Sequence, residues 1–153
     1  MKGRRYLKSP LAVISWGLVL LWMAVIFYLS AQVADESSQL SSGITEVVGN
    51  TIQRILPFKF DSEHLHFLIR KGAHFTAYFI LGLLTINAFR VSGLNRKQDI
   101  QTALLVCILY AISDEIHQLY VPGRSGQVTD VLIDSAGAVT GLGVYQVIRW
   151  YFK

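Results

Sequence analysis

The stretch Asp114–Gly141 reads DEIHQLYVPGRSGQVTDVLIDSAGAVTG and joins two long apolar runs through a short break at Pro122-Gly123. It places four carboxylates and one arginine at the facing ends of those runs. Charged side chains in or beside apolar segments of this length are costly, and they persist where they pair, line a wet cavity or take part in function. The stretch therefore predicts a polar site at the ends of membrane-crossing helices.

The composition of the whole chain indicates a membrane protein. Of its 153 residues, 52% are hydrophobic and 16% are charged, whereas soluble chains average about 45–50% apolar and about 25% charged residues. The net charge of +4 does not indicate nucleic-acid binding, because the basic residues cluster at the ends of apolar runs, where topology-setting charges lie. The single cysteine, Cys107, lies inside an apolar run, so we expect neither a disulfide framework nor a paired-cysteine metal site.

Four apolar segments are long enough to cross a bilayer, at about residues 11–29, 72–89, 100–118 and 128–148. About 20 helical residues, at about 1.5 Å each, span a hydrocarbon core of about 30 Å. The first segment is longer than the apolar region of a signal peptide, which is usually about 7–15 residues, so we expect a retained anchor. The sequence predicts one all-α domain over residues 1–153, a bundle of four transmembrane helices.

The segment 31–70 between the first two spans is polar. Apolar residues from Leu40 to Leu56 recur in it at helical spacing, and Pro57 ends the pattern. This periodicity predicts an amphipathic helix that lies on the membrane surface or over the bundle.

The basic residues are distributed unevenly over the segments that connect the spans. If the N-terminus is cytoplasmic, more of the basic residues lie on the cytoplasmic side than on the outer side. This asymmetry predicts a multi-pass protein with both termini in the cytoplasm. The polar ends of the second, third and fourth spans then lie at one membrane depth on the extracytoplasmic side.

These helix ends predict a site that faces outward. Residues one helical turn apart share a face, so Asp130 lies over Asp134, and Asp114 over Gln118. A guanidinium can hold a phosphate or carboxylate through two parallel hydrogen bonds, and closely spaced carboxylates can shift each other's pKa and exchange protons. The residues expected to carry acid–base chemistry are Asp114, Glu115 and His74. Those expected to bind the ligand are Lys71, Tyr78, Gln118, Arg124, Asp130 and Asp134.

We predict no cofactor and no metal site, with Mg²⁺ or Zn²⁺ as an alternative. The four carboxylates offer the oxygen ligands that Mg²⁺ prefers, and His64, His66 and His117 offer nitrogen ligands for Zn²⁺. No spacing among these residues matches a metal-binding motif.

A structural interpretation of the same residues is also open. Ion pairs such as Lys71 with Asp114, or Arg124 with Asp130, would pin helix ends together without a ligand. Gly137 and Gly141, four residues apart, would let another helix approach closely, either within the chain or in an oligomer. A small transporter is a weaker alternative, because the ionisable groups of spans two to four gather at their outer ends.

Several ordered motifs resemble the VanZ-like family. They are Lys71-x-x-His74-Phe75-x-x-Tyr78, Asp114-Glu115-x-x-Gln118, Pro122-Gly123-Arg124, Asp130-Val131-Leu132-Ile133-Asp134 and Gly137-Ala138, with Ser30-x-Gln32 after the first span. At the position of Asp134 many members of that family have asparagine. The resemblance covers about residues 20–145.

The resemblance implies a small integral membrane protein of the bacterial cell envelope. The family is named for an accessory protein of glycopeptide-resistance clusters that lowers susceptibility to teicoplanin-type drugs, and the resemblance implies no settled reaction. We therefore expect a protein of the bacterial cytoplasmic membrane that binds or modifies a membrane lipid or lipid-linked cell-wall precursor. The alternative is a non-enzymatic interaction protein whose charged cluster only holds its helices together.

Overall fold

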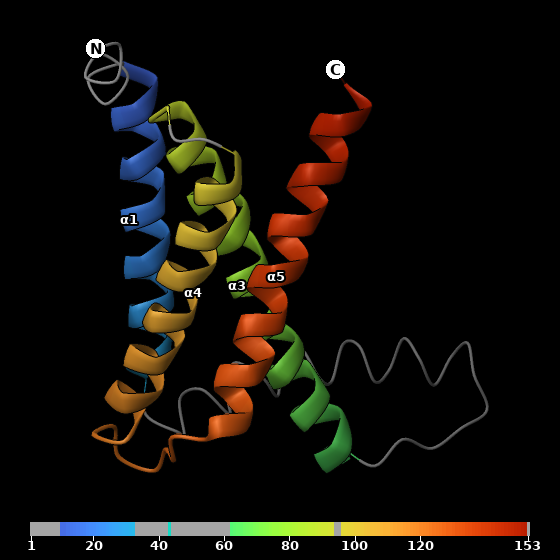
Figure 1. Ribbon diagram of the computed structural model, residues 1–153. Helices are drawn as coiled ribbons and strands as arrows, with labels where there is room; N and C mark the ends of the chain where they lie inside the picture. Colours follow the sequence, from blue (N-terminus) through green and yellow to red (C-terminus); the bar gives the residue numbers. More distant parts are fainter. Residues whose placement is uncertain (1–9, 33–42, 44–61, 94–95, 153) are drawn as a thin grey trace, which may run out of the picture.

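The chain folds as a bundle of long helices. The computed structural model describes residues 10–32, 43, 62–93 and 96–152, and the regular elements in those ranges are all α-helices. They are α1 (Pro10–Ser30), α3 (Ser62–Val91), α4 (Arg96–Gln118) and α5 (Val128–Tyr151) (Figure 1). The predicted all-α class is confirmed. The predicted amphipathic helix between Leu40 and Leu56 lies outside the described residues.

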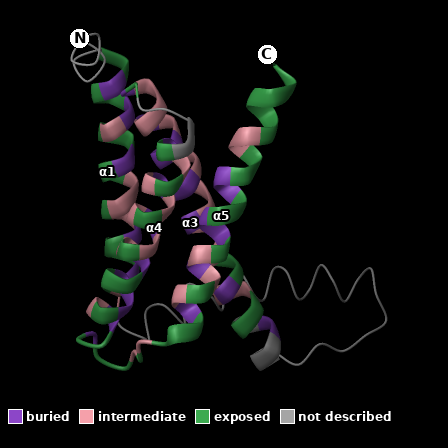
Figure 2. Cartoon of the chain, viewed as in Figure 1, coloured by how far each residue is buried: buried purple, intermediate pink, exposed green. Residues whose placement is uncertain are grey.

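Each of the four helices is long and apolar enough to cross a membrane. The candidate spans are Pro10–Ser30, Phe67–Val91, Gln98–Gln118 and Val128–Tyr151. Large apolar side chains are exposed along the helices, and exposed residues line the outer surfaces of the bundle (Figure 2). A bundle of four such helices with large apolar side chains on its outside is a multi-pass membrane protein.

Consecutive helices run in opposite directions (Figure 1). The ends of α1 and α4 therefore lie near the beginnings of α3 and α5, at the end of the bundle that holds the turn between α4 and α5. Helix α3 begins at Ser62, well before residue 72, where the sequence predicted the second span to start. Lys71 accordingly lies inside a continuous helix and not at its first turn.

Helices α3 and α5 cross at very close range. A Cβ atom at Gly137 would overlap the backbone carbonyl of Phe75, and one at Gly141 would overlap that of Phe79. From the other side, a Cβ atom at Gly82 would lie 2.6 Å from the carbonyl oxygen of Ala138. Both glycines that the sequence singled out on α5 thus serve packing inside the chain, as expected of small residues four apart.

An apolar core fills the middle of the bundle. Its buried members come from all four helices: Val19, Ile26, Tyr78, Leu81, Ala88, Cys107, Ala111 and Ala138. Two aromatic side chains join helices across this layer, because Trp22 Nε1 donates to the carbonyl of Ala77 at 2.9 Å and Tyr110 Oη donates to that of Met23 at 2.5 Å. The core separates the polar groups at the two ends of the bundle.

Candidate functional site

Buried polar side chains gather where α1 and α4 end and where α3 and α5 begin. We call them the polar cluster, and its members are Ser30, Lys71, His74, Asp114, Glu115, Gln118, Asp130 and Asp134. All of these are buried except His74, whose side chain is 14% exposed. The structure thus brings together most of the site residues that the sequence predicted.

The contact between α3 and α5 is an ion pair. Lys71 Nζ donates to Asp130 Oδ1, and it also lies 3.5 Å from Gln127 Oε1. Asp130 is fully buried, and its other oxygen lies 4.0 Å from the guanidinium of Arg70. The partner of Lys71 is therefore Asp130, and not Asp114 as in the pairing suggested by the structural interpretation.

Two hydrogen bonds from uncharged side chains connect α1 and α4, and one of them ends on a carboxylate. Ser30 Oγ donates to Asp114 Oδ2 at 2.8 Å, and Gln118 Nε2 donates to Ser30 Oγ at 3.3 Å. All three side chains are buried. Hydrogen bonds to a buried carboxylate partly replace the water it has lost, and this one fixes the last residue of α1 against α4.

Glu115 anchors the turn that leads into α5. Its Oε2 accepts the backbone N–H of Gln127 at 2.7 Å. The turn can approach this closely because a Cβ atom at Gly126 would lie 2.7 Å from the carbonyl oxygen of Glu115. Gly123 has φ of 76°, a left-handed conformation that favours glycine. The Pro-Gly break in the sequence therefore folds back onto α4.

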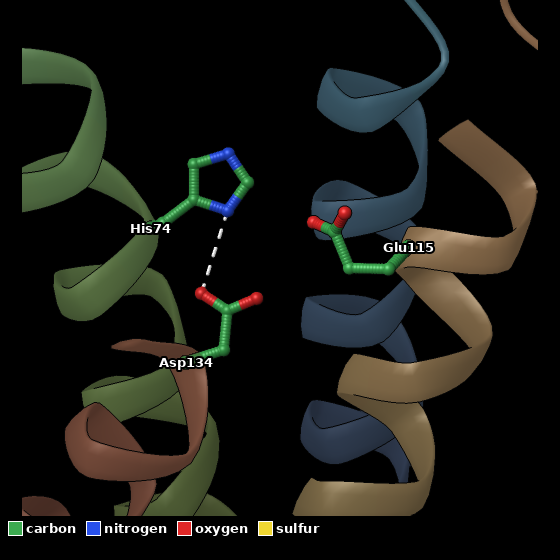
Figure 3. A group of neighbouring side chains, drawn as sticks. All are labelled: His74, Glu115 and Asp134. Atoms are coloured by element: carbon green, nitrogen blue, oxygen red, sulfur yellow. Dashed lines mark ion pairs between the residues drawn. The ribbon is translucent and has the colours of Figure 1, made fainter. Parts of the chain in front are cut away.

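Three helices meet at His74, Glu115 and Asp134. His74 Nδ1 on α3 lies 3.4 Å from Asp134 Oδ1 on α5. The Glu115 carboxylate points from α4 toward this pair (Figure 3). One ligand atom from each residue can be chosen so that no two are more than 4.8 Å apart.

Several buried oxygens of the polar cluster have no hydrogen-bond partner among the residues that the structure describes. They are Asp114 Oδ1, Glu115 Oε1, Gln118 Oε1, Asp130 Oδ2 and both carboxylate oxygens of Asp134. Buried polar atoms are nearly always hydrogen-bonded in folded proteins, and leaving one unpaired costs about 1–3 kcal/mol. These oxygens can therefore accept hydrogen bonds from a bound ligand or bind a cation.

Arg124 lies in the turn beside these acceptors and is partly buried. Its guanidinium has no ion pair or hydrogen bond with another described residue, so the pairing with Asp130 is not formed. Burial lowers the pKa of Arg124, and the positive charge of Arg70 lowers it further. A guanidinium is charged at any physiological pH, and this one has donors available for an anion.

Tyr78 lies deeper than the other predicted ligand-binding residues. It is fully buried in the apolar core, and its ring centroid is 6.1 Å from that of Tyr110. Its hydroxyl has no hydrogen-bond partner in the described part of the chain. Tyr78 thus belongs to the apolar core and not to the hydrogen-bonded part of the polar cluster.

His117, one of the histidines considered for Zn²⁺, stacks on Phe27 with ring centroids 4.3 Å apart. It is not part of the group formed by His74, Glu115 and Asp134. The side chains of His64 and His66 lie outside the described residues.

Sequence reasoning did not select Ser30 and Gln127 as site residues. Ser30 is the polar residue that ends the first apolar run, and Gln127 immediately precedes α5. Both positions were visible in the sequence as helix boundaries. Their contacts depend on how α1 and the turn pack against α4, which no local pattern reports.

A second polar group at the other end of the bundle was also missed. Arg90 Nε lies 3.3 Å from Asp99 Oδ2, and Arg90 also donates to Gln146 Oε1 at 2.7 Å. Asp99 is buried, and it lies between the segments that the sequence predicted as the second and third spans.

The fold and the polar cluster define the class of this protein: a multi-pass helical membrane protein with a buried ionisable site at one end of its bundle. Residues 15–149 match the family model described as VanZ/LLP1, and the chain belongs to that family. Neither the curated proteins nor the solved structures contain a significant match.

Proposed function

We propose that the polar cluster binds the polar headgroup of a lipid or lipid-linked precursor of the bacterial cell envelope. The observation that carries this proposal is the set of buried, unpartnered oxygens beside a guanidinium with donors available. A phosphate-bearing headgroup with hydroxyl or amide donors is complementary to both. Arg124 would hold the phosphate through two hydrogen bonds, and the free oxygens of Asp114, Glu115 and Asp134 would accept the donors.

The position of the cluster suits a ligand that stays in the membrane. It lies at one end of four candidate spans, at the depth where a lipid presents its headgroup while its chains remain beside the apolar helices. The distribution of basic residues supports an extracytoplasmic location in the cytoplasmic membrane, with both termini inside. His74 and Asp114 are then the groups placed to move a proton on a bound headgroup.

Family membership supports a link to glycopeptide action. Occupying or altering a lipid-linked precursor at the outer surface would change the access of teicoplanin-type drugs to their target.

A structural role for part of the cluster is favoured by a specific observation. The pairs Lys71 with Asp130 and Ser30 with Asp114 are already closed within the chain. They would hold helices together with or without a ligand. This alternative does not account for the unpartnered oxygens of Asp134 and Glu115.

Binding is tested on detergent-purified full-length protein with undecaprenyl phosphate, a lipid-linked peptidoglycan precursor and phosphatidylglycerol, each titrated while thermal unfolding is followed. A ligand that binds only the folded state raises the melting temperature by mass action. We expect one of the phosphate-bearing lipids to stabilise the wild type. Arg124→Gln should weaken that lipid at least about tenfold, because a hydrogen bond to a charged group contributes about 1.5–3 kcal/mol.

Arg149→Gln is the matched control. Arg149 is exposed near the end of α5, so this variant loses the same charge at the opposite end of the bundle. Equal binding by the two variants, or no stabilisation of the wild type by any of the three lipids, would remove the proposal in favour of the structural role.

A further inference from the structure

His74, Glu115 and Asp134 bring three potential metal ligands close together. His74 Nδ1 and Asp134 Oδ1 are 3.4 Å apart, and Asp134 Oδ1 makes no hydrogen bond with the described residues. A good N–H···O bond is about 2.9–3.0 Å long, so the contact of 3.4 Å is long for a hydrogen bond. Two ligands of one tetrahedral zinc ion, each about 2.0–2.2 Å from the metal, lie about 3.3–3.6 Å from each other.

The third ligand comes from a different helix and is available. Glu115 uses Oε2 for the N–H of Gln127, while its buried Oε1 has no partner. The carboxylate points toward His74 and Asp134 (Figure 3), and a ligand atom of each residue lies within 4.8 Å of the other two. A bound ion would draw these ligand atoms closer together, while Oε2 of Glu115 stays on the N–H of Gln127.

The charges of the described residues also call for a cation. Lys71 forms its ion pair with Asp130. Asp114 accepts a hydrogen bond from the neutral hydroxyl of Ser30. Glu115 and Asp134, which are 5% and 0% exposed, have the imidazole of His74 near them, and Arg124 in the turn forms an ion pair with neither carboxylate among the described residues. Buried carboxylates are stable when paired, protonated or bound to a metal, and a divalent ion would neutralise two of them.

We propose that His74, Glu115 and Asp134 bind one divalent transition-metal ion of the Zn²⁺ type. Imidazole nitrogens and carboxylate oxygens are both zinc ligands in proteins, and three protein ligands leave one position for water or a ligand oxygen. The imidazole disfavours Mg²⁺, which prefers oxygen ligands in an octahedron. This inference does not rest on headgroup binding, because the metal is measured without lipid.

The test is metal binding by the detergent-purified full-length protein. The protein is stripped with a chelator, dialysed and titrated with Zn²⁺ or Mg²⁺ against a competing chromophoric chelator, and the bound metal is counted by mass spectrometry. We expect one Zn²⁺ per chain and a higher melting temperature with Zn²⁺. His74→Gln and Asp134→Ala should each weaken Zn²⁺ more than about a hundredfold, since losing even an outer partner of a ligand costs about 10–100-fold.

His117→Gln is the matched control, because it removes a histidine at the same end of the bundle that lies outside the group. It should bind Zn²⁺ as the wild type does. The wild type loaded with Co²⁺ gives a test that needs no variant: a visible absorption band of tetrahedral intensity is expected.

Three results would overturn the inference. They are the absence of stoichiometric Zn²⁺ in the wild type, Zn²⁺ binding that survives both His74→Gln and Asp134→Ala, and Co²⁺ bound without a tetrahedral band. The second result would assign the ion to other residues, such as His64 and His66. Lipid binding by a protein that takes up no metal would overturn this inference alone and leave the proposed function standing.

Discussion

Removing the charge of Lys71 should destabilise the fold far more than an ordinary polar contact between membrane helices. Lys71→Met keeps the length of the side chain and leaves the carboxylate of Asp130, which is 0% exposed, without its partner. Breaking one side of a buried pair costs about 3–5 kcal/mol in soluble proteins. Arg70 lies 4.0 Å from the other oxygen of Asp130 and compensates in part, so we expect the low end, about 3 kcal/mol.

A loss of this size is large enough to measure. For chains of about 150–250 residues, 1 kcal/mol corresponds to about 2–4 °C in melting temperature, so Lys71→Met should melt about 6–12 °C below the wild type. The double variant Lys71→Met with Asp130→Asn removes the unpaired charge, and it should recover most of the loss. The assay is tryptophan fluorescence during heating of the purified protein, with the four proteins arranged as a double-mutant cycle.

The cycle also tests whether Lys71 neutralises the buried carboxylate of Asp130. Polar contacts between membrane helices average only about 0.6 kcal/mol in such cycles. If Lys71→Met costs no more than that, or if the double variant is less stable than either single variant, then Lys71 does not hold the charge of Asp130. Lys97 is the second residue of α4, at the opposite end of the bundle, and Lys97→Met is the control for the loss of a lysine.

Three further changes test the packing and the hydrogen bonds. Gly137→Val should lower stability by about 1–3 kcal/mol, the usual cost of overpacking, because the new side chain overlaps the backbone of α3; Ala136→Val on the exposed face should not, and equal melting temperatures would show that the two helices are not in close contact. Ser30→Ala should cost about 1–3 kcal/mol by leaving a buried carboxylate oxygen unpaired, whereas Ser113→Ala, at an exposed serine of α4, should be close to neutral in the same melts. Arg124→Gln should leave stability within about 0.5 kcal/mol of the wild type, and an unfolding midpoint that falls as far as that of Lys71→Met would contradict this.

The positive charge of Arg124 does not stabilise the fold, as the direction of its pKa shift indicates. Burial lowers the pKa of this guanidinium, and Arg70 adds to the effect, so folding disfavours its charged form. A base with a lower pKa in the fold than in the unfolded chain is destabilising at every pH below its folded pKa. The arginine is charged throughout the physiological range, so its charge does not contribute to stability there. A bound anionic ligand would give this charge a favourable partner.

The helices could be predicted from the sequence because the relevant property is local. An uninterrupted apolar run can be compared directly with the thickness of a bilayer, and the run that begins at Pro10 predicted α1 to within a residue or so. The beginning of α3 could not be found in this way. Residues 62–71 continue the same helix but mix charged residues and histidines with apolar ones, and hydropathy reports the apolar length of a helix and not its full length.

The convergence of the polar residues was predictable, but their partners were not. Alternating helix directions place Lys71, Asp114 and Asp130 at the same end of the bundle. Which carboxylate Lys71 reaches depends on the rotation and depth of α5 against α3. Both are set by the contact of Gly137 with the backbone of Phe75, a long-range feature that spacing along one helix does not encode. The buried pair of Arg90 and Asp99 was missed for the same reason.

The contacts divide the polar cluster into two parts with different roles. In one part, Lys71 with Asp130 and Ser30 with Asp114 are closed pairs between neighbouring helices, and their loss should lower stability. In the other part, His74, Glu115 and Asp134 face one another, and Glu115 Oε1 and both carboxylate oxygens of Asp134 accept no hydrogen bond from the described residues. A site kept only for stability gains nothing from buried carboxylates left in this state, because a neutral or apolar residue of similar size is often as stable or more so. Stability therefore accounts for the first part, and the cation or headgroup proposed above would account for the second.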